Sequence, residues 1–267
     1  MSRARVLVLG AAGRMGRALC RLLADGAEPG LELAAALERP GHPDAGCEVG
    51  DGVKLTDDWA AALATGPDVA VDFSHFSATA DNARRLAEAG VAWVLGTTGI
   101  DEAGRAAVEA ASGKIAVLQS ANMSLGIHLL AALARKAAEA LKGKGYDCEI
   151  TERHHRHKKD APSGTALLLG RAAAEGFGWD LDDVRKDGRS GQTGERPERE
   201  IGFHAVRAGG IVGEHDVLFA AEGETLTLSH SLGSRDTLAA GALKAAAWLA
   251  AGRAAGLYGM EDVLGLR

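Results

Sequence analysis

The stretch from Glu152 to Thr165 holds the residues of this sequence that are best suited to chemistry. It reads E-R-H-H-R-H-K-K-D-A-P-S-G-T, so every residue from 153 to 159 is Arg, His or Lys. Crowding these cations costs electrostatic repulsion, which a bound anion would relieve. Histidine also gives and takes protons near neutral pH. The stretch therefore combines side chains for anion binding with side chains for proton transfer.

A predicted helix begins where the basic run ends. Ser163 is a good N-cap residue, and the run T-A-L-L-L-G-R-A-A-A-E, which follows Gly164, has a helix-forming composition. Gly164 and Thr165 would then present backbone N–H groups at the positive end of the helix dipole, beside the cations. This arrangement predicts a pocket for a carboxylate or a phosphate.

Two other interpretations of the basic run compete with this pocket. A run of charges is usually a solvated surface loop, and composition alone does not decide between a loop and a pocket. Zinc binding is the second interpretation. However, His154 and His155 are adjacent and would point to opposite sides of an extended chain. No cysteine or carboxylate pair lies nearby at ligand spacing, and the flanking cations would repel a dication. We therefore expect no metal.

The N-terminal residues form a second motif, which consists of a strand, a glycine turn and a helix. Residues 5–10, R-V-L-V-L-G, have the apolar character of a buried parallel strand, and a helical pattern begins near residue 17. The turn between them comprises Gly10, Ala11, Ala12, Gly13, Arg14, Met15 and Gly16. Its glycine spacing is a close variant of the dinucleotide fingerprint, in which the glycines permit a tight turn, approach of a pyrophosphate and close helix packing.

An acidic residue at the expected distance supports a dinucleotide site. Glu38 ends a second apolar run, L-E-L-A-A-A-L, where a carboxylate can accept hydrogen bonds from an adenosine ribose. Arg39 follows directly and could hold the 2′-phosphate of NADPH. The pair therefore suits either NADH or NADPH. The alternative is that the glycines serve an ordinary turn and that Glu38 and Arg39 are surface residues.

Length and composition exclude several classes of protein. The chain has 267 residues, of which 46% are hydrophobic, so it can bury a substantial core. Its net charge of −6 argues against a role in coating nucleic acid or an anionic membrane. No apolar run reaches the ~18 residues that a spanning helix needs. Cys20, Cys47 and Cys148 are scattered, which indicates neither a disulfide framework nor a zinc ribbon. We expect a soluble cytoplasmic protein.

Strand and helix patterns alternate through the first half of the chain. Strands are expected at 69–73, 91–96 and 115–119, with helices near 77–89 and 101–112. This alternation predicts a Rossmann-like, doubly wound parallel sheet, which binds ligands at the carboxyl ends of its strands. Two strand ends carry candidate nicotinamide-side residues, namely Gly96, Thr97 and Thr98 at the first and Ser120, Ala121, Asn122 and Met123 at the second. These residues could equally serve ordinary turns, with Thr98 or Asn122 capping a helix.

The pattern changes after a helix expected near 124–142. Closely spaced strands are expected near 200–207, 211–220 and 224–232, which predicts a smaller α+β domain with an antiparallel or mixed sheet. A helix at 239–250 and an apolar, helical tail would return to the first domain. We therefore expect a dinucleotide-binding domain at 1–125, a substrate-binding and oligomerisation domain at 126–234, and a returning segment at 235–267. A single sheet with helices on one side leaves its other face uncovered, and homo-oligomerisation is the usual way to cover it.

Together these motifs resemble the bacterial dihydrodipicolinate reductase family, whose members are now called 4-hydroxy-tetrahydrodipicolinate reductases and belong to the diaminopimelate route to lysine. The basic run carries the most specific part of the resemblance. The other matching runs are G-A-A-G-R-M-G, G-T-T-G, A-N-M-S-L-G, V-R-A-G-G-I-V-G-E-H and G-L-Y-G-M-E-D-V-L. The resemblance spans the whole chain.

The resemblance implies an activity and a role for each motif. The enzyme would reduce 4-hydroxy-tetrahydrodipicolinate, a small cyclic dicarboxylate, to tetrahydrodipicolinate with loss of water, using NADH or NADPH. By this resemblance His154 and Lys158 are catalytic, and His155, Gly164 and Thr165 hold the substrate. The turn at 10–15, Glu38, Arg39, 96–98 and 120–123 would hold the coenzyme. The resemblance also implies a homotetramer that assembles through the sheet of the second domain.

Two positions depart from the family pattern. The family often has an arginine where this chain has His75, and an aromatic residue where it has Met123. These departures imply weaker contacts at the phosphate or nicotinamide end of the coenzyme. Two other functions fit the motifs less closely: a different two-domain imine reductase or amino-acid dehydrogenase, and a nicotinamide-sensing module that binds nucleic acid or a partner through its basic run.

Overall fold

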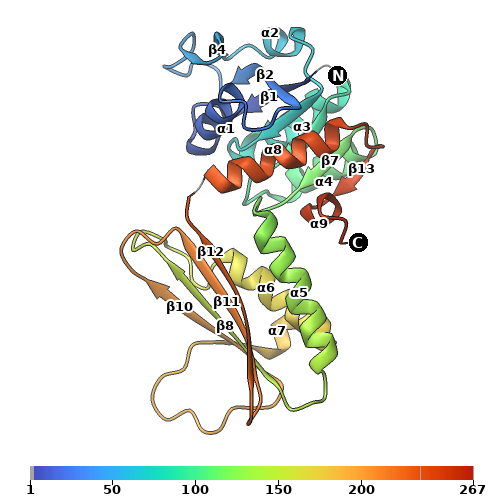
Figure 1. Ribbon diagram of the computed structural model, residues 1–267. Coiled ribbons are helices and arrows are strands. Elements are labelled where there is room, and N and C mark those ends of the chain that lie inside the picture. Colours follow the sequence, from blue (N-terminus) through green and yellow to red (C-terminus); the bar gives the residue numbers. More distant parts are fainter. Residues whose placement is uncertain (1–2, 235, 267) are drawn as a thin grey trace. The chain divides into compact units, whose positions relative to one another are not determined.

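The computed structural model describes residues 3–234 and 236–266 of the chain. These residues divide into two compact units, one formed by 3–124 with 236–265 and the other by 125–234 (Figure 1). The predicted boundary residue 235, and the terminal residues 1, 2 and 267 of the predicted domains, lie outside the described ranges.

The first unit is built on an eight-stranded sheet with the order β13-β7-β6-β5-β1-β2-β4-β3. All neighbouring strands are parallel except the hairpin of β3 and β4. This confirms the predicted doubly wound fold. The strands are β1 (Ala4–Leu9), β2 (Leu31–Leu37), β3 (Glu48–Gly50), β4 (Val53–Thr56), β5 (Val69–Asp72), β6 (Ala92–Leu95), β7 (Ala116–Gln119) and β13 (Gly256–Tyr258).

Helices cover both faces of this sheet, which explains why its central strands are continuously apolar. On one face α1 packs against α8, and on the other α2, α3 and α4 contribute to a shared hydrophobic core (Figure 1). The elements are α1 (Arg14–Ala24), α2 (Trp59–Ala64), the 3₁₀ turn η1 (Phe76–Ala78), α3 (Thr79–Ala89), α4 (Glu102–Ser112), α8 (Asp236–Ala250) and α9 (Met260–Val263).

The glycine turn between β1 and α1 has the close contacts that its spacing predicts. Gly10 has φ +74°, a left-handed conformation that favours glycine, and a Cβ there would lie 2.9 Å from the Cα of Ser74. A Cβ on Gly16 would lie 2.2 Å from the carbonyl oxygen of Gly10 and 2.5 Å from the Cα of Ala11. The first turn of α1 therefore packs directly on the backbone of the turn.

The C-terminal tail differs from the predicted helix. Residues 256–258 form β13, which pairs in parallel with β7 at the sheet edge, and only α9 is helical. The expected pattern also missed β3, β4 and the three-residue strand β9 (Arg185–Asp187). Segments this short carry too few residues for a period of two or 3.6 to be visible, and their strand character comes from the neighbour they pair with.

The second unit contains a five-stranded mixed sheet with the order β12-β11-β8-β10-β9. Strand β8 is parallel to β10 and antiparallel to β11. The mixed sheet confirms the predicted α+β class. Its other elements are α5 (Leu125–Leu141), β8 (Asp147–His154), α6 (Gly164–Phe177), α7 (Leu181–Val184), β10 (Ile201–Arg207), β11 (Gly213–Ala220) and β12 (Thr225–Leu232).

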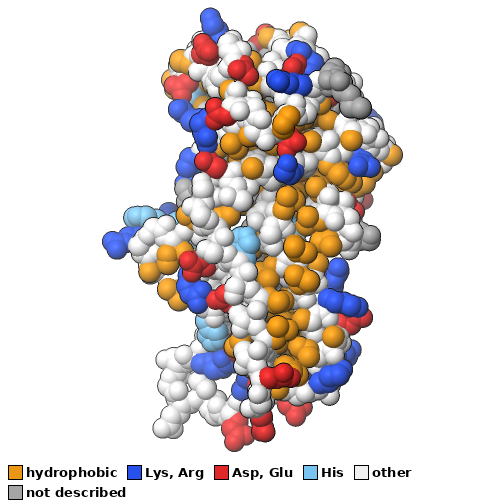
Figure 2. All heavy atoms as spheres, viewed as in Figure 1, with side chains coloured by type: hydrophobic (Ala, Val, Ile, Leu, Met, Phe, Trp, Pro, Cys, Tyr) orange, Lys and Arg blue, Asp and Glu red, His pale blue; other side chains and the backbone are white. Residues whose placement is uncertain are grey.

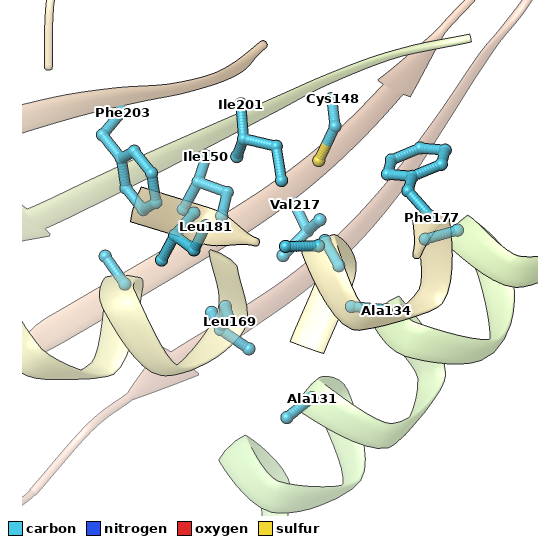
Figure 3. Packing of buried hydrophobic residues seen from close by; sticks show 14 of the residues in the cluster. Ala131, Ala134, Cys148, Ile150, Leu169, Phe177, Leu181, Ile201, Phe203 and Val217 are labelled. Carbon is cyan, nitrogen blue, oxygen red and sulfur yellow. The ribbon is translucent and has the colours of Figure 1, made fainter. Parts of the chain in front are cut away.

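Helices α5 and α6 pack on one face of this sheet and form its core. Ile150 of β8 and Val217 of β11 point toward Leu169 of α6 (Figure 3). A Cβ on Gly176 would lie 2.2 Å from the carbonyl oxygen of Arg135, so α6 lies close against the backbone of α5. Burial alternates strictly along β8, so its even-numbered residues face the helices and its odd-numbered residues face the opposite side.

One side of α5 carries exposed apolar residues. Leu129 and Leu133, which are four residues apart on one helix face, are 44% and 48% exposed. Figure 2 shows hydrophobic side chains gathered along this helix. Within residues 3–234 and 236–266, no helix is both long enough and apolar enough to cross a membrane.

We predict that Gly16→Ala destabilises the protein and weakens coenzyme binding. The added methyl would meet the backbone of Gly10 and Ala11, which cannot move without opening the turn. Overpacking of this kind costs about 1–3 kcal/mol. Thermal unfolding and NADH titration measure both effects. Gly30→Ala is the matched control, because a Cβ there meets nothing within 4 Å. Unchanged stability of Gly16→Ala would contradict this account of the turn.

Candidate functional site

A fully buried carboxylate lies at the centre of the candidate site. Glu152 of β8 is 0% exposed, and its Oε2 lies 2.5 Å from Nδ1 of His154, two residues along the same face. Arg207 of the neighbouring β10 donates to both carboxylate oxygens at 2.7 Å. The backbone N–H of Ser163 donates to Oε1 at 3.1 Å. Both oxygens of Glu152 are thus held by partners from three segments.

The protonation of this group follows from its surroundings. Burial raises the pKa of Glu152, but hydrogen bonds from Arg207 and His154 outweigh burial and leave the pKa below its ordinary value. An ionised carboxylate only accepts hydrogen bonds, so Nδ1 of His154 carries the proton that lies between them. Burial lowers the pKa of His154, and the positive charges of Lys158 and Arg207 lower it further, while Glu152 opposes them. His154 is therefore a neutral imidazole with an unprotonated Nε2.

Strand β11 lines the other side of His154. A Cβ on Gly213 would lie 3.2 Å from Nε2 of His154, so glycine leaves that nitrogen uncovered. The ring of His215 meets the His154 ring edge-on at 5.1 Å. Burial lowers the pKa of His215 to about 4, so it is neutral at physiological pH. Its Nε2 lies 3.1 Å from Oγ of Ser163, which also accepts from the N–H of Ala166 at 3.1 Å as the predicted N-cap of α6.

The helix start and the loop before it lie beside this group. Gly164 and Thr165 are the first two residues of α6. Lys158 of the loop donates to Asp160 at 2.9 Å and keeps 21% of its side chain exposed. Arg207 also donates to the carbonyl oxygen of Asp160 at 2.6 Å, which ties the loop to the buried carboxylate. The structure thus brings together His154, Lys158 and the start of α6.

The seven-residue basic run does not act as one cluster. Arg153 faces the opposite side of β8, where it pairs with Asp216 at 2.7 Å and Glu214 at 3.5 Å. His157 and Lys159 are exposed. Alternation along β8 separates Arg153 from His154, and a turn at 156–157, where the Lys158 N–H donates to the carbonyl oxygen of His155 at 3.1 Å, redirects the chain beyond them. The seven basic side chains therefore do not share one face.

A second carboxylate on the opposite face of β8 has a similar set of partners. Arg189 donates to both oxygens of Glu149, at 2.7 and 3.0 Å, and Nε2 of His204 lies 2.6 Å from Oε2. Although burial raises the pKa of Glu149, hydrogen bonds from Arg189, Arg196 and His204 lower it to about 2. Gly202 makes room for this carboxylate, since a Cβ there would lie 1.9 Å from Oε2.

In the first unit, Glu38 lies beside the glycine turn. Its Oε1 accepts the N–H of Ala12 at 3.1 Å, and its Oε2 accepts the N–H of Arg39 at the same distance. The Arg39 side chain is exposed. Gly13 is the exposed N-cap of α1, so the turn leads into the positive end of an 11-residue helix. These features fit a dinucleotide, with phosphate at the helix start and ribose near Glu38.

The strand end at 96–98 is supported by a buried aspartate. Oγ1 of Thr97 donates to the carbonyl oxygen of Ser74 at 3.1 Å and lies 3.4 Å from Asp72. Burial raises the pKa of Asp72, while hydrogen bonds from Ser74 and Asn82 lower it in part. Thr98 is exposed. The Thr97 hydroxyl therefore stabilises the local fold, and of residues 96–98 only Thr98 is exposed.

The strand end at 120–123 uses several of its polar groups internally. Oδ1 of Asn122 accepts the N–H of Ser124 at 2.8 Å, and the hydroxyl of Ser120 donates to the carbonyl oxygen of Asn122 at 2.6 Å. Met123 is 2% exposed, and a Cβ on Gly241 of α8 would lie 1.8 Å from its carbonyl oxygen. Asn122 thus forms a local turn just before α5 begins at Leu125, which supports the turn interpretation of this segment, and the Met123 side chain is buried.

Sequence reasoning missed four residues that organise these sites: Glu152, Arg207, His215 and Asp72. Glu152 could have been identified from the sequence, because it lies two positions before His154 and a strand would place both side chains on one face. Arg207 and His215 come from strands whose register the sequence does not reveal. Among the described residues, no group of three or more His, Cys, Asp or Glu side chains is arranged to hold a metal ion.

Family models match both units. Residues 4–123 match the model described as dihydrodipicolinate reductase, N-terminus, and residues 126–264 match the model of its C-terminus. A curated relative from Thiobacillus denitrificans, named 4-hydroxy-tetrahydrodipicolinate reductase, is 52% identical over 98% of this chain and 99% of its own. A relative of the same name from an Anaeromyxobacter species is 50% identical over 98% of both chains.

Solved structures share the fold. A dipicolinate-bound dihydrodipicolinate reductase from Paenisporosarcina sp. TG-14 superimposes with a TM-score of 0.77, at 24% identity, over 97% of this chain and 99% of that one. A probable dehydrogenase from Thermotoga maritima gives a TM-score of 0.63 at 12% identity, over 98% and 93% of the two chains. At these identities the likeness concerns the fold alone.

Proposed function

Because this chain belongs to the dihydrodipicolinate reductase family, we propose that the Glu152–His154 group and the start of α6 form the substrate site of the reductase. The enzyme is an NAD(P)H-dependent oxidoreductase of the diaminopimelate route to lysine, and it reduces 4-hydroxy-tetrahydrodipicolinate. The observation that carries the site proposal is the neutral His154, aimed by a buried carboxylate and adjacent to a helix start.

In this proposal the substrate carboxylates are bound by the helix start and by Lys158. The N–H groups of Gly164 and Thr165 donate to one carboxylate at the positive end of the helix dipole, and His155 contributes to the same pocket. Lys158 supplies a charge-assisted hydrogen bond. A bound dianion raises the pKa of His154 and so favours its protonated form. His154 then protonates the ring of the reduced substrate from Nε2.

The coenzyme site belongs to the first unit. When bound, NADH or NADPH supplies the hydride. The turn at 10–15 approaches the pyrophosphate, Glu38 accepts hydrogen bonds from the ribose and Arg39 pairs with a 2′-phosphate. The loops at 96–98 and 120–123 approach the nicotinamide side. Because Thr97 and Asn122 use their side chains internally, we expect the backbone of these loops to make most of the contacts.

We also propose that the enzyme is a cytoplasmic homotetramer. Helices α5 and α6 cover one face of the five-stranded sheet, and its other face carries paired charges such as Arg153 with Asp216. A second copy of the chain could cover that face with matching geometry. All three cysteines are free thiols, which is typical of a reducing compartment.

The activity is tested by following coenzyme oxidation. We expect NADH and NADPH to be oxidised when freshly generated 4-hydroxy-tetrahydrodipicolinate is added, and expect no oxidation with a 2-oxo acid and ammonia. The second assay separates this enzyme from an amino-acid dehydrogenase. The proposal would be contradicted by turnover with the oxo acid and ammonia but none with 4-hydroxy-tetrahydrodipicolinate. Binding of DNA or RNA with an affinity that rivals that for a small dicarboxylate would also contradict it.

We predict that His154→Ala lowers the turnover number by ~10²–10⁴-fold, as loss of a positioned proton donor does. The Michaelis constant should rise only modestly if the interaction belongs to the transition state. Lys158→Ala should impair both parameters, because an ammonium also binds substrate in the ground state. The exposed neighbours provide matched controls: His157→Ala and Lys159→Ala should be mild. A large loss of turnover in His157→Ala together with nearly normal turnover in His154→Ala would contradict the catalytic role assigned to His154.

Arg39→Ala should weaken NADPH more than NADH. Loss of the partner of the 2′-phosphate costs roughly 1.5–3 kcal/mol, which is about tenfold or more in affinity. The Michaelis constants for the two coenzymes, measured at saturating substrate, report the difference. Arg21→Ala, at the last turn of α1, is the control and should change neither constant. Equal changes with both coenzymes in Arg39→Ala would remove Arg39 from the phosphate site.

A further inference from the structure

We infer that Glu152 is a positioning residue of this enzyme: clamped by Arg207, it holds the His154 ring and keeps a proton on Nδ1, so that Nε2 is the nitrogen that exchanges a proton with substrate. The inference rests on the proposed role of His154. It adds a requirement that family membership does not assign, namely that a buried carboxylate and an arginine on another strand determine how the histidine works.

The geometry leaves Glu152 almost no freedom. Arg207 grips both of its oxygens at 2.7 Å in the planar, two-point arrangement that arginine makes with carboxylates. The Ser163 N–H adds a third donor at 3.1 Å. Rotation of the carboxylate would break these bonds inside a fully buried site, where unpaired charge is very costly. The oxygen that faces His154 is therefore fixed in place.

A fixed anionic acceptor determines the tautomer of the histidine. Oε2 of Glu152 lies 2.5 Å from Nδ1 of His154 and can only accept, so Nδ1 donates. Nε2 is left with its lone pair in the neutral ring. That nitrogen lies beside Gly213, where a Cβ would approach it to 3.2 Å, so any larger residue would crowd the reactive nitrogen. The strand register thus places Nε2 beside Gly213, where there is no side chain, and pairs Nδ1 with Glu152.

The charges around His154 make Glu152 decisive for its proton affinity. The groups that face the ring are Glu152 on its own strand, Arg207 on β10, His215 on β11 and Lys158 in the loop. Arg207 and Lys158 disfavour an imidazolium, and neutral His215 does not favour one. Glu152 supplies the negative charge in this set. Without it the acid form of His154 would be confined to lower pH.

In this inference His154 gives its Nε2 proton to the ring after hydride transfer. Once the 4-hydroxy group has left as water, the ring is a conjugated imine, and hydride addition at C4 converts it to an enamine. The electron pair of the enamine forms a new C–H bond with the proton from Nε2. The N–H bond at Nε2 breaks, and the imidazolium becomes the neutral ring with its proton still on Nδ1. Glu152 remains ionised throughout and stabilises the imidazolium that precedes transfer. Solvent returns a proton to Nε2 for the next cycle.

The first test is Glu152→Gln, which keeps the size of the side chain and removes its charge. An amide N–H₂ facing Nδ1 would force the opposite tautomer and oppose the imidazolium. We expect turnover to fall roughly 10²–10⁴-fold. The basic limb of the pH profile should move to lower pH, because loss of the carboxylate lowers the pKa of His154. NADH affinity should not change. Glu152→Asp, which restores the charge, should recover part of the activity and move the limb back.

Glu149→Gln is the matched control for a merely structural effect. Glu149 has a two-point arginine and a histidine partner on the opposite face of the same strand. Its substitution should lower the unfolding temperature while leaving the position of the basic limb unchanged. If Glu152→Gln loses turnover but keeps the parental pH profile, or if Glu149→Gln moves that profile equally, the inference fails.

A measurement on the unaltered protein keeps the inference testable even if Glu152→Gln does not fold. In ¹⁵N-histidine NMR, with His154→Ala to assign the signals, neutral His154 should carry its proton on Nδ1. The opposite tautomer would overturn the inference whatever the kinetics show. The role of His154 is judged separately: parental turnover in His154→Ala refutes the proposed role of His154, whereas loss of turnover there with an unaltered Glu152→Gln variant refutes only the positioning role of Glu152.

Discussion

The two-point ion pair between Glu152 and Arg207 is the interaction on which the rest of the proposed substrate site depends. It joins β8 to β10, and through the same two residues it reaches the His154 ring, the Ser163 N–H and the Asp160 carbonyl. Removing Arg207 would leave the fully buried Glu152 carboxylate without its main partner, a situation that typically costs several kcal/mol. The strand, the basic loop and the start of α6 are therefore positioned by a single satisfied group.

This arrangement reconciles two demands that oppose each other. Binding a dicarboxylate favours many cations, but cations near a histidine lower its pKa and remove its proton. In this protein the alternation of β8 sends Arg153 to the opposite face, where acidic residues pair with it, and keeps Glu152 beside His154. In the proposed site, Lys158 and the helix start would supply the attraction for anions, while Glu152 raises the proton affinity of the His154 ring.

Much of this could be predicted from sequence because the signals were local. The turn of Gly10 and Gly16, the N-cap Ser163 and the strands of the first unit all follow from patterns within a few residues. The strand β13 and the partners Arg207 and His215 could not be predicted, because they depend on pairing between strands far apart in sequence. The basic run shows the same limit: composition revealed its charge, but only the strand register showed which side chains share a pocket.

The most direct test of the account is a crystal structure of the enzyme with pyridine-2,6-dicarboxylate, a planar mimic of the substrate. The account predicts one carboxylate on the N–H groups of Gly164 and Thr165, the second near Lys158, and Nε2 of His154 facing the ring while Nδ1 stays on Glu152. A dicarboxylate bound away from the start of α6, or a His154 ring turned so that Nδ1 leaves Glu152, would contradict it.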